Sequence, residues 1–251
     1  MKTNKEIKNS QNRVFRKIGQ ANESYNLINE NDKIMVAVSG GVDSFVLLET
    51  LASRLKHLPI KYTIHAIHVV IENLPIQTDT ESITEKCEIL GIPLHIEKTS
   101  ISKEENKKTS TCFPCSWNRR KIVFKKAKEL GFNKVALGHH LDDALETLMM
   151  NTVHHAEISA IPPKLLMVKG NIEIIRPLIL LTEEEVKAYA EIKNITSAEE
   201  PCPFEEESKR KTFKEIIKKI GSMHKEAKIN MFNSMTNIIP EYLPPKRGIQ
   251  K

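Results

Sequence analysis

Two groups of residues in this chain have types and spacings that can do chemistry. The first is Ser39-Gly-Gly-Val-Asp-Ser44, which ends a short apolar run and precedes a helical pattern. The order of strand, glycine turn and helix directs backbone N–H groups and the positive end of a helix at one point, as in phosphate sites. The glycines allow close approach to an anion, and Ser39 and Ser44 add hydroxyl donors. The alternative is an ordinary turn in which Asp43 or Ser44 caps the helix.

The second group is three cysteines. Cys112 and Cys115 form a CxxC pair, and Cys202 lies between two prolines. Structural disulfides are rare in the cytoplasm, so the CxxC pair indicates either a metal site or a redox pair. Three thiolates could hold an iron–sulfur cluster with one iron open to a small ligand such as sulfide. A zinc site would need a fourth ligand, for example a histidine. The fourth cysteine, Cys87, lies in an apolar helical pattern and is interpreted as a core residue.

Composition limits the class of protein. The 251 residues are 40% hydrophobic and 28% charged, which is typical of a soluble globular protein. No stretch approaches the roughly 20 apolar residues of a membrane span. The first residues, Met1–Lys5, lack the apolar segment of a secretory signal. We therefore expect a cytoplasmic protein that has no membrane segment.

The positive charge is uneven along the chain. The net charge is +6, and it is concentrated in residues 97–128, with ten basic and three acidic side chains, and in residues 203–251, with eleven and six. Basic segments near a nucleotide site indicate a polyanionic partner, of which nucleic acid is the first candidate. A solvated, lysine-rich surface is the alternative.

Short apolar strands alternate with helical patterns over the first 155 residues. We expect strands at Lys33–Val38, Tyr62–Val70, Pro93–Glu97 and Lys134–Leu137. We expect helices at about Lys5–Asn29, Ser44–Leu55, Ile76–Leu90, Ser116–Leu130 and Asp142–His155, with Gly91 and Gly131 as helix C-caps. This alternation predicts an α/β, Rossmann-like parallel sheet with helices on both faces. Its ligands should lie at the carboxyl ends of the strands, where Ser39 and Gly138 fall.

The pattern changes after residue 160. Two short strands are expected around Lys169-Gly-Asn171, followed by a helix that opens with a capping box at Thr182. Two more helices are expected at Thr212–Ile220 and Ala227–Ile239. We therefore predict an N-terminal helix over residues 1–30, a nucleotide-binding domain over 31–180 that carries the CxxC pair, and a helical C-terminal extension over 181–251 that supplies the third cysteine.

Five ordered motifs resemble the tRNA 2-thiocytidine synthetase family of the PP-loop ATP pyrophosphatase superfamily. The first is the SGGxDS loop. Four others are similar to the family's TCxxCxxxRR, ALGHHxDD, PPKL and IRPL, and they lie at Thr111–Arg120, Ala136–Asp143, Pro162–Leu165 and Ile175–Leu178. A last helix, Met231–Pro240, also matches, so the resemblance runs from about Asn12 to Leu243.

The resemblance implies an ATP-dependent enzyme that adenylates the C2 oxygen of a tRNA pyrimidine and replaces it with sulfur. It implies a 4Fe-4S cluster on Cys112, Cys115 and Cys202, ATP with Mg2+ on the loop, and tRNA as the substrate. The sulfur would come from a cysteine desulfurase or free sulfide, and the protein could form a homodimer. Asp43, Asp142 and Cys202 are the expected catalytic residues. The expected nucleotide-binding residues are Ser39, Gly40, Gly41, Asp43, Ser44, Arg119, His139, Asp142 and Asp143.

Several roles stay open at this stage. Asp142 and Asp143 could hold Mg2+ or only cap a helix, and His139 and His140 could contact ATP or only line a turn. Arg119 and its neighbour Arg120 could reach a phosphate or form an exposed basic helix face.

The sequence also departs from the family pattern. Val42 replaces a common loop lysine, Cys202-Pro-Phe-Glu205 lacks a second CxxC, and Val69–Glu72 replaces an LDQ-like stretch. The modified base is therefore not fixed by the resemblance. A persulfide-based thiolase that acts on another base or a small molecule, and a zinc-stapled RNA-binding protein without catalysis, are the alternatives.

Overall fold

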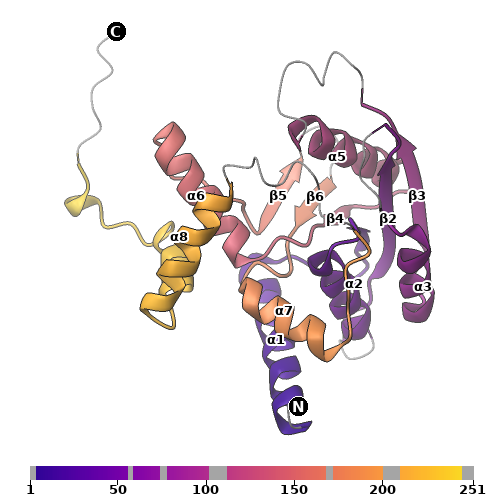
Figure 1. Ribbon diagram of the computed structural model, residues 1–251, viewed down its shortest axis with the longest axis horizontal. Coiled ribbons are helices and arrows are strands. Elements are labelled where there is room, and N and C mark those ends of the chain that lie inside the picture. Colours follow the sequence, from indigo (N-terminus) through magenta and orange to yellow (C-terminus); the bar gives the residue numbers. More distant parts are fainter. Residues whose placement is uncertain are drawn as a thin grey trace.

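One twisted sheet organises the molecule (Figure 1). The computed structural model describes residues 4–55, 59–73, 78–101, 112–167, 172–199 and 210–244. In these ranges the sheet has six strands in the order β3-β2-β1-β4-β6-β5. All neighbours pair in parallel except the edge strand β5, which is antiparallel to β6. The strands are β1 (Lys33–Ala37), β2 (Thr63–Ile71), β3 (Leu94–Thr99), β4 (Lys134–Ala136), β5 (Lys164–Met167) and β6 (Ile172–Ile175).

The predicted α/β class and all of the predicted strands are confirmed. The two strands expected after residue 160 are β5 and β6, while the turn Lys169-Gly-Asn171 between them lies outside the described residues. The predicted C-caps are also confirmed, because Gly91 and Gly131 have φ angles of 67° and 71°. Such left-handed conformations favour glycine, which has no Cβ to clash with the backbone.

Helices cover both faces of the sheet. They are α1 (Asn4–Tyr25), α2 (Val42–Leu55), α3 (Thr80–Leu90), α5 (Cys112–Glu129), α6 (Leu141–His155), α7 (Glu183–Ile192), α8 (Arg210–Met223) and α9 (Ala227–Ser234). In the view of Figure 1, α5 lies above the sheet, and α2 and α7 lie below it. None of the helices in the described ranges has the length and apolar character that crossing a membrane requires.

Several helix boundaries differ from those expected. The first helix ends at Tyr25 and not near Asn29, because Asn26 adopts a left-handed conformation with φ 50°. The helix expected from Ile76 begins at Thr80, after its N-cap Asp79.

The helix expected at Ser116 begins at Cys112, so both cysteines of the CxxC pair lie in its first turn. Pro114 is compatible with this, because the first turn of a helix leaves its backbone N–H groups unpaired. The helix expected to reach Ile239 ends at Ser234. Pro240 favours an extended preceding residue, and Ile239 has φ −108° and ψ 94°.

The parallel strands contribute side chains to two separate cores. Along β1, Ile34 and Val36 pack toward α2, whereas Met35 packs with residues of α5 such as Val123 and Ala127. Burial on both faces explains why the parallel strands read as nearly continuous apolar runs. The C-terminal helices α8 and α9 pack against α6. The fold thus places the β1–α2 loop, the β4–α6 loop and the start of α5 at one edge of the sheet.

Candidate nucleotide-binding site

The loop between β1 and α2 has a backbone that only glycine tolerates at its centre. Gly40 has φ 107°, and a Cβ there would lie 2.9 Å from Cγ2 of Thr78. The Ser39 hydroxyl accepts a hydrogen bond from the Gly41 N–H at 3.1 Å. The Ser44 hydroxyl donates to the Gly41 carbonyl at 2.7 Å. These short-range contacts hold the tight turn at the positive end of α2, which is a favourable place for an anion.

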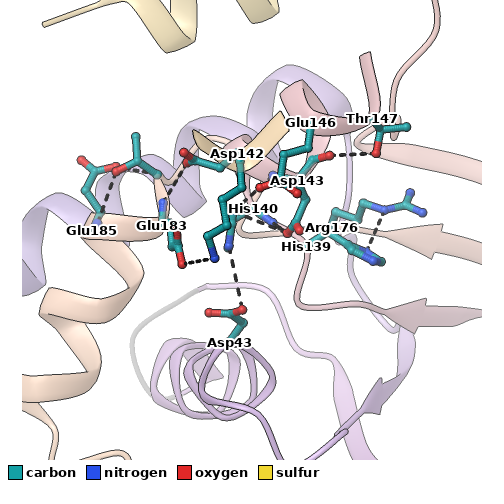
Figure 2. A network of polar contacts seen from close by, with 12 residues as sticks. Asp43, His139, His140, Asp142, Asp143, Glu146, Thr147, Arg176, Glu183 and Glu185 are labelled. Atoms are coloured by element: carbon teal, nitrogen blue, oxygen red, sulfur yellow. Dashed lines mark hydrogen bonds and ion pairs between the residues drawn. The ribbon is translucent and has the colours of Figure 1, made fainter. Parts of the chain in front are cut away.

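The β4–α6 loop packs directly on this turn. A Cβ at Gly138 would lie 3.1 Å from both the carbonyl carbon and the carbonyl oxygen of Asp43. A larger residue at position 138 would therefore force the two loops apart by a few tenths of an ångström. Across this contact, Nε2 of His140 lies 3.9 Å from a carboxylate oxygen of Asp43 (Figure 2).

A cavity of about 300 Å³ opens between these loops and the first turns of α5. Its floor is apolar and includes Ile67 and Val69 of β2, Ala37 of β1 and Val135 of β4. Six of the residues predicted to bind the nucleotide line it, namely Ser39, Asp43, Ser44, Arg119, His139 and Asp143. An apolar cavity with a few convergent polar groups at the carboxyl ends of parallel strands is typical of a ligand site in this class of fold.

Arg176 fixes the hydrogen-bonding state of His139. The guanidinium of Arg176 donates from Nη1 to the Pro162 carbonyl at 2.6 Å and from Nε to Nδ1 of His139 at 3.3 Å (Figure 2). A guanidinium cannot accept, so Nδ1 of His139 is the acceptor and its Nε2 carries the proton. Burial, together with nearby arginine charges such as Arg176, lowers the pKa of His139 to about 4. His139 therefore lines the cavity as a neutral hydrogen-bond donor.

The adjacent residues Asp142 and Asp143 have different surroundings. Asp143 forms a capping box, in which its carboxylate accepts from the His140 N–H at 2.9 Å, and it lines the cavity. Asp142 is only 4% exposed and accepts from Nζ of Lys228 at 2.5 Å and from the Glu183 N–H at 2.9 Å. The structure thus joins Asp143 to the predicted site and ties Asp142 to α7 and α9.

Asp43, Asp143, Glu146 and Glu183 form a group of interacting carboxylates, of which Asp43 and Asp143 line the cavity. Burial raises the pKa of Asp43, with a further rise from the nearby Asp143 and Glu183 carboxylates that His140 opposes. Burial, reinforced by Asp143, raises the pKa of Glu146 to about 7. Burial and the mutual repulsion of these carboxylates thus disfavour their charged forms.

Two basic residues of α8 reach this acidic group. Nε of Arg210 lies 3.5 Å from Glu146, and Nζ of Lys214 donates to Glu183 at 2.8 Å. Burial alone would raise the pKa of Glu183, but hydrogen bonds from Lys187 and Lys214 lower it to about 2. No local pattern in the sequence predicts a role for Glu146, Arg176, Lys214 or Lys228. Only Arg176 lies in a motif that the resemblance had singled out.

The cysteines are partly outside the described residues. Cys115 is half-buried in the first turn of α5, whereas the side chain of Cys112 and all of Cys202 lie outside the described part. Among the residues that the structure describes, no group of three or more His, Cys, Asp or Glu side chains could hold a metal ion.

The segment before Cys202 contacts the loop and α5. The Ala198 N–H donates to the Gly40 carbonyl at 2.8 Å. Nη1 of Arg119, one turn after Cys115, lies 3.4 Å from Glu199. These contacts bring the last described residue before Cys202 to the same edge of the sheet as the CxxC pair.

A fold and a loop of this kind define the class of PP-loop proteins. The profile of the PP-loop domain matches residues 8–220. Two curated relatives are named tRNA-cytidine(32) 2-sulfurtransferase. The protein from Herminiimonas arsenicoxydans is 37% identical over 240 residues, covering 92% of this chain and 74% of that protein. The protein from Janthinobacterium sp. (strain Marseille) is 36% identical over 243 residues, covering 93% and 75%. The chain belongs to the PP-loop family and, within it, to the family of tRNA-cytidine(32) 2-sulfurtransferases.

A solved structure shares the fold. The U34-tRNA thiolase NcsA from Methanococcus maripaludis, solved with its 4Fe-4S cluster, superposes with a TM-score of 0.76 and 23% sequence identity. The match covers 96% of this chain and 82% of that one. It confirms the α/β architecture predicted from the sequence.

Proposed function

We propose that this chain is an ATP-dependent tRNA sulfurtransferase that converts a cytidine of tRNA to 2-thiocytidine. The family to which it belongs supports the activity. The observation that carries the proposal is the cavity that joins the PP-loop, His139 and Asp143 to the helix bearing the CxxC pair. Activation of the base by ATP and transfer of sulfur to it need two sites that reach the same base. The PP-loop and the CxxC helix would provide these two sites at the carboxyl ends of the strands.

The proposed reaction has two displacement steps. First, the C2 oxygen of the base attacks the α-phosphorus of ATP, and pyrophosphate leaves. A sulfur nucleophile then attacks C2, and AMP leaves with the original oxygen. Amide groups of the loop and Ser39 and Ser44 would bind the phosphates, and His139 would donate a hydrogen bond from Nε2. The Asp43 and Asp143 carboxylates are suited to hold Mg2+, which would neutralise the charge that develops on the pyrophosphate.

We propose different roles for the two acidic residues that begin α6. Asp143 has its carboxylate at the cavity, so it keeps the predicted role as a nucleotide or Mg2+ ligand. Asp142 is buried against Lys228, and we propose that it positions the first turn of α6 without contacting the nucleotide. The alternative is the catalytic role that the sequence predicted for Asp142. The double variant Asp142→Asn/Lys228→Met distinguishes the two roles.

The donor set fits an iron–sulfur cluster. Cys112 and Cys115 are three residues apart in one helix, which places them on the same face. Cys202 follows Glu199 by three residues, a stretch that spans at most about 11 Å, and Glu199 is paired with Arg119. We propose that these three cysteines hold a 4Fe-4S cluster, which when bound supplies an open iron for sulfide.

Other features of the proposal rest on the family or the sequence. The sulfur donor would be free sulfide or a cysteine desulfurase, and the protein would act in the cytoplasm, where its tRNA substrate is found. The division into residues 1–30, 31–180 and 181–251 and the possible homodimer also stay predictions.

Metal analysis of anaerobically purified protein tests the cluster. We expect about four irons and four sulfides per chain and a broad visible absorbance that is lost in air. The Cys202→Ser variant should lose the iron and the sulfurtransferase activity but keep its affinity for ATP, because the loop is built from separate residues. Cys87→Ala is the matched control, since Cys87 is buried in the core. Stoichiometric zinc would contradict the cluster and favour a stapled RNA-binding protein. Formation of 2-thiocytidine by a protein without metal would contradict it and favour a persulfide relay.

A further inference from the structure

A second concave region lies away from the catalytic cavity, between α1 and the chain that leads into α9. It comprises two neighbouring cavities of about 550 and 500 Å³ that share Arg13 and Lys225. We call the pair the α1–α9 groove. The side chains that line the larger cavity are all polar: Asn9, Asn12, Arg13, Arg16, Lys225 and Glu226.

The cations of the groove fall into two sets. The inner set is paired with carboxylates: Nε of Arg13 and Nζ of Lys17 lie 2.7 and 2.6 Å from Glu185, and Lys228 contacts Asp142. The outer set is Arg16, Lys218 and Lys225, which are all exposed.

In the described part of the chain no carboxylate pairs with Arg16, Lys218 or Lys225. Glu226 is the only acidic side chain that lines the larger cavity. Three unpaired cations therefore project from a groove whose inner cations are already neutralised.

The groove shares a wall with the catalytic cavity. Leu141 lines the groove, Asp143 lines the catalytic cavity, and both belong to the first turn of α6. Lys228 lines the groove and donates a hydrogen bond to Asp142, which lies between Leu141 and Asp143 in the chain. The smaller cavity of the groove and the catalytic cavity thus adjoin at the first turn of α6.

We propose that the α1–α9 groove binds the sugar-phosphate backbone of the RNA substrate. The proposal rests on the proposed function. Arginine, lysine and asparagine are the side chains that contact phosphate and sugar oxygens in nucleic-acid complexes. Protein–protein interfaces, in contrast, have an apolar and aromatic centre, which the larger cavity lacks. The groove would hold the strand while the catalytic cavity receives the base.

A charge-reversal pair with a matched control tests the groove. The test variant is Arg16→Glu/Lys225→Glu. The control is Lys33→Glu/Lys61→Glu, which makes the same change in net charge at exposed residues next to the amino ends of β1 and β2. All proteins are titrated with a tRNA transcript that has a cytidine at position 32, at several salt concentrations, and separately with ATP.

We expect the groove variant to lose at least tenfold in affinity for the tRNA. The slope of log affinity against log salt concentration should fall by about 2, since each lost phosphate contact removes about 0.9. The control should change much less, and both variants should bind ATP and melt as the wild type does. Equal losses of tRNA affinity in the two variants, or normal tRNA affinity in the groove variant, would contradict the proposal that the groove binds RNA.

The outcome also separates the groove from the proposed function. If the wild type forms 2-thiocytidine and the groove variant binds tRNA normally, the proposed RNA-binding role of the groove is wrong and the proposed enzymatic function is supported. If only the groove variant loses tRNA affinity and none of the proteins forms a thiolated base, the RNA-binding role of the groove is supported and the proposed enzymatic function is wrong. A wild type that binds no tRNA would overturn both.

Discussion

The catalytic cavity and the α1–α9 groove lie on opposite sides of the first turn of α6 and are built in different ways. The cavity has an apolar floor, and its ionisable groups are held by neighbours, as His139 is by Arg176. The groove is polar, and its outer cations are exposed. Desolvation strengthens the electrostatic contacts that activate a base, whereas binding an RNA backbone needs accessible charge. The comparison indicates that activation and docking are separate tasks, divided by a single helical turn.

The largest effect should come from Asp43→Ala, which acts on the cavity alone. Removing this carboxylate should lower the rate of AMP formation by roughly 10²–10³-fold, the typical cost of losing one charge-stabilising contact at an active site. Iron content and tRNA affinity should remain unchanged. Pyrophosphate release, measured with and without tRNA, checks the rate. A parallel loss of tRNA affinity would show that the two regions are not separate.

Lys228→Met should be the most destabilising change at the wall between the two regions. It leaves the Asp142 carboxylate buried without its cation, which typically costs about 3–5 kcal/mol of the free energy of unfolding. The double variant Asp142→Asn/Lys228→Met should recover most of this loss. Denaturant titrations of the three proteins give the values.

The same variants decide the role of Asp142. If Asp142 only positions the turn, the stable double variant should form AMP at close to the wild-type rate. A folded double variant that binds ATP and tRNA but forms no AMP would instead establish Asp142 as catalytic, as the sequence predicted.

The pH dependence of the free energy of unfolding tests the raised pKa of Glu146. Its pKa of about 7 lies above the ordinary value of 4.5, so the folded protein binds more protons than the unfolded chain between these values. Stability should therefore fall as the pH rises from 4.5 to 7, by at most about 3 kcal/mol. Glu146→Gln should remove this contribution. Thermal melts across this range check the slope, and the same slope in wild type and variant would contradict the assignment.

Gly138→Ala should destabilise the protein less than Lys228→Met does. The new Cβ would lie 3.1 Å from the Asp43 carbonyl, so the loops must separate slightly. We expect a loss of about 1–3 kcal/mol and a weaker affinity for ATP. Gly19→Ala is the control, because a Cβ there meets only the Arg54 guanidinium at 3.8 Å. Equal ATP affinity in the Gly138 variant and the wild type would show that the loop contact does not shape the nucleotide site.

Most of the fold was predictable because its signals are local. Apolar strands, the glycine C-caps Gly91 and Gly131, and the capping box at Thr182 each lie within a few residues of the element they define. The end of α9 was not predicted, because the apolar pattern continues through Ile239 although the helix ends at Ser234.

The sequence predicted which residues form the site but not which other side chains these residues contact. The loop and the histidine–aspartate motif identified most of the polar side chains that line the cavity. The sequence could not show which of Asp142 and Asp143 faces it, because Lys228 lies 86 residues from Asp142. The state of His139 likewise depends on Arg176, 37 residues away. Such contacts come from packing, and no local pattern encodes them.

Nucleoside analysis of tRNA shows whether this chain is an ATP-dependent tRNA sulfurtransferase. Anaerobically purified protein would be incubated with ATP, Mg2+, sulfide and a tRNA transcript that has a cytidine at position 32, and the digest would be analysed by mass spectrometry. We expect 2-thiocytidine, with one AMP and one pyrophosphate formed for each sulfur incorporated, and all three products formed roughly 10²–10³-fold more slowly by Asp43→Ala. AMP formation without a thiolated nucleoside, or a thiolated nucleoside formed without ATP, would contradict the proposed function.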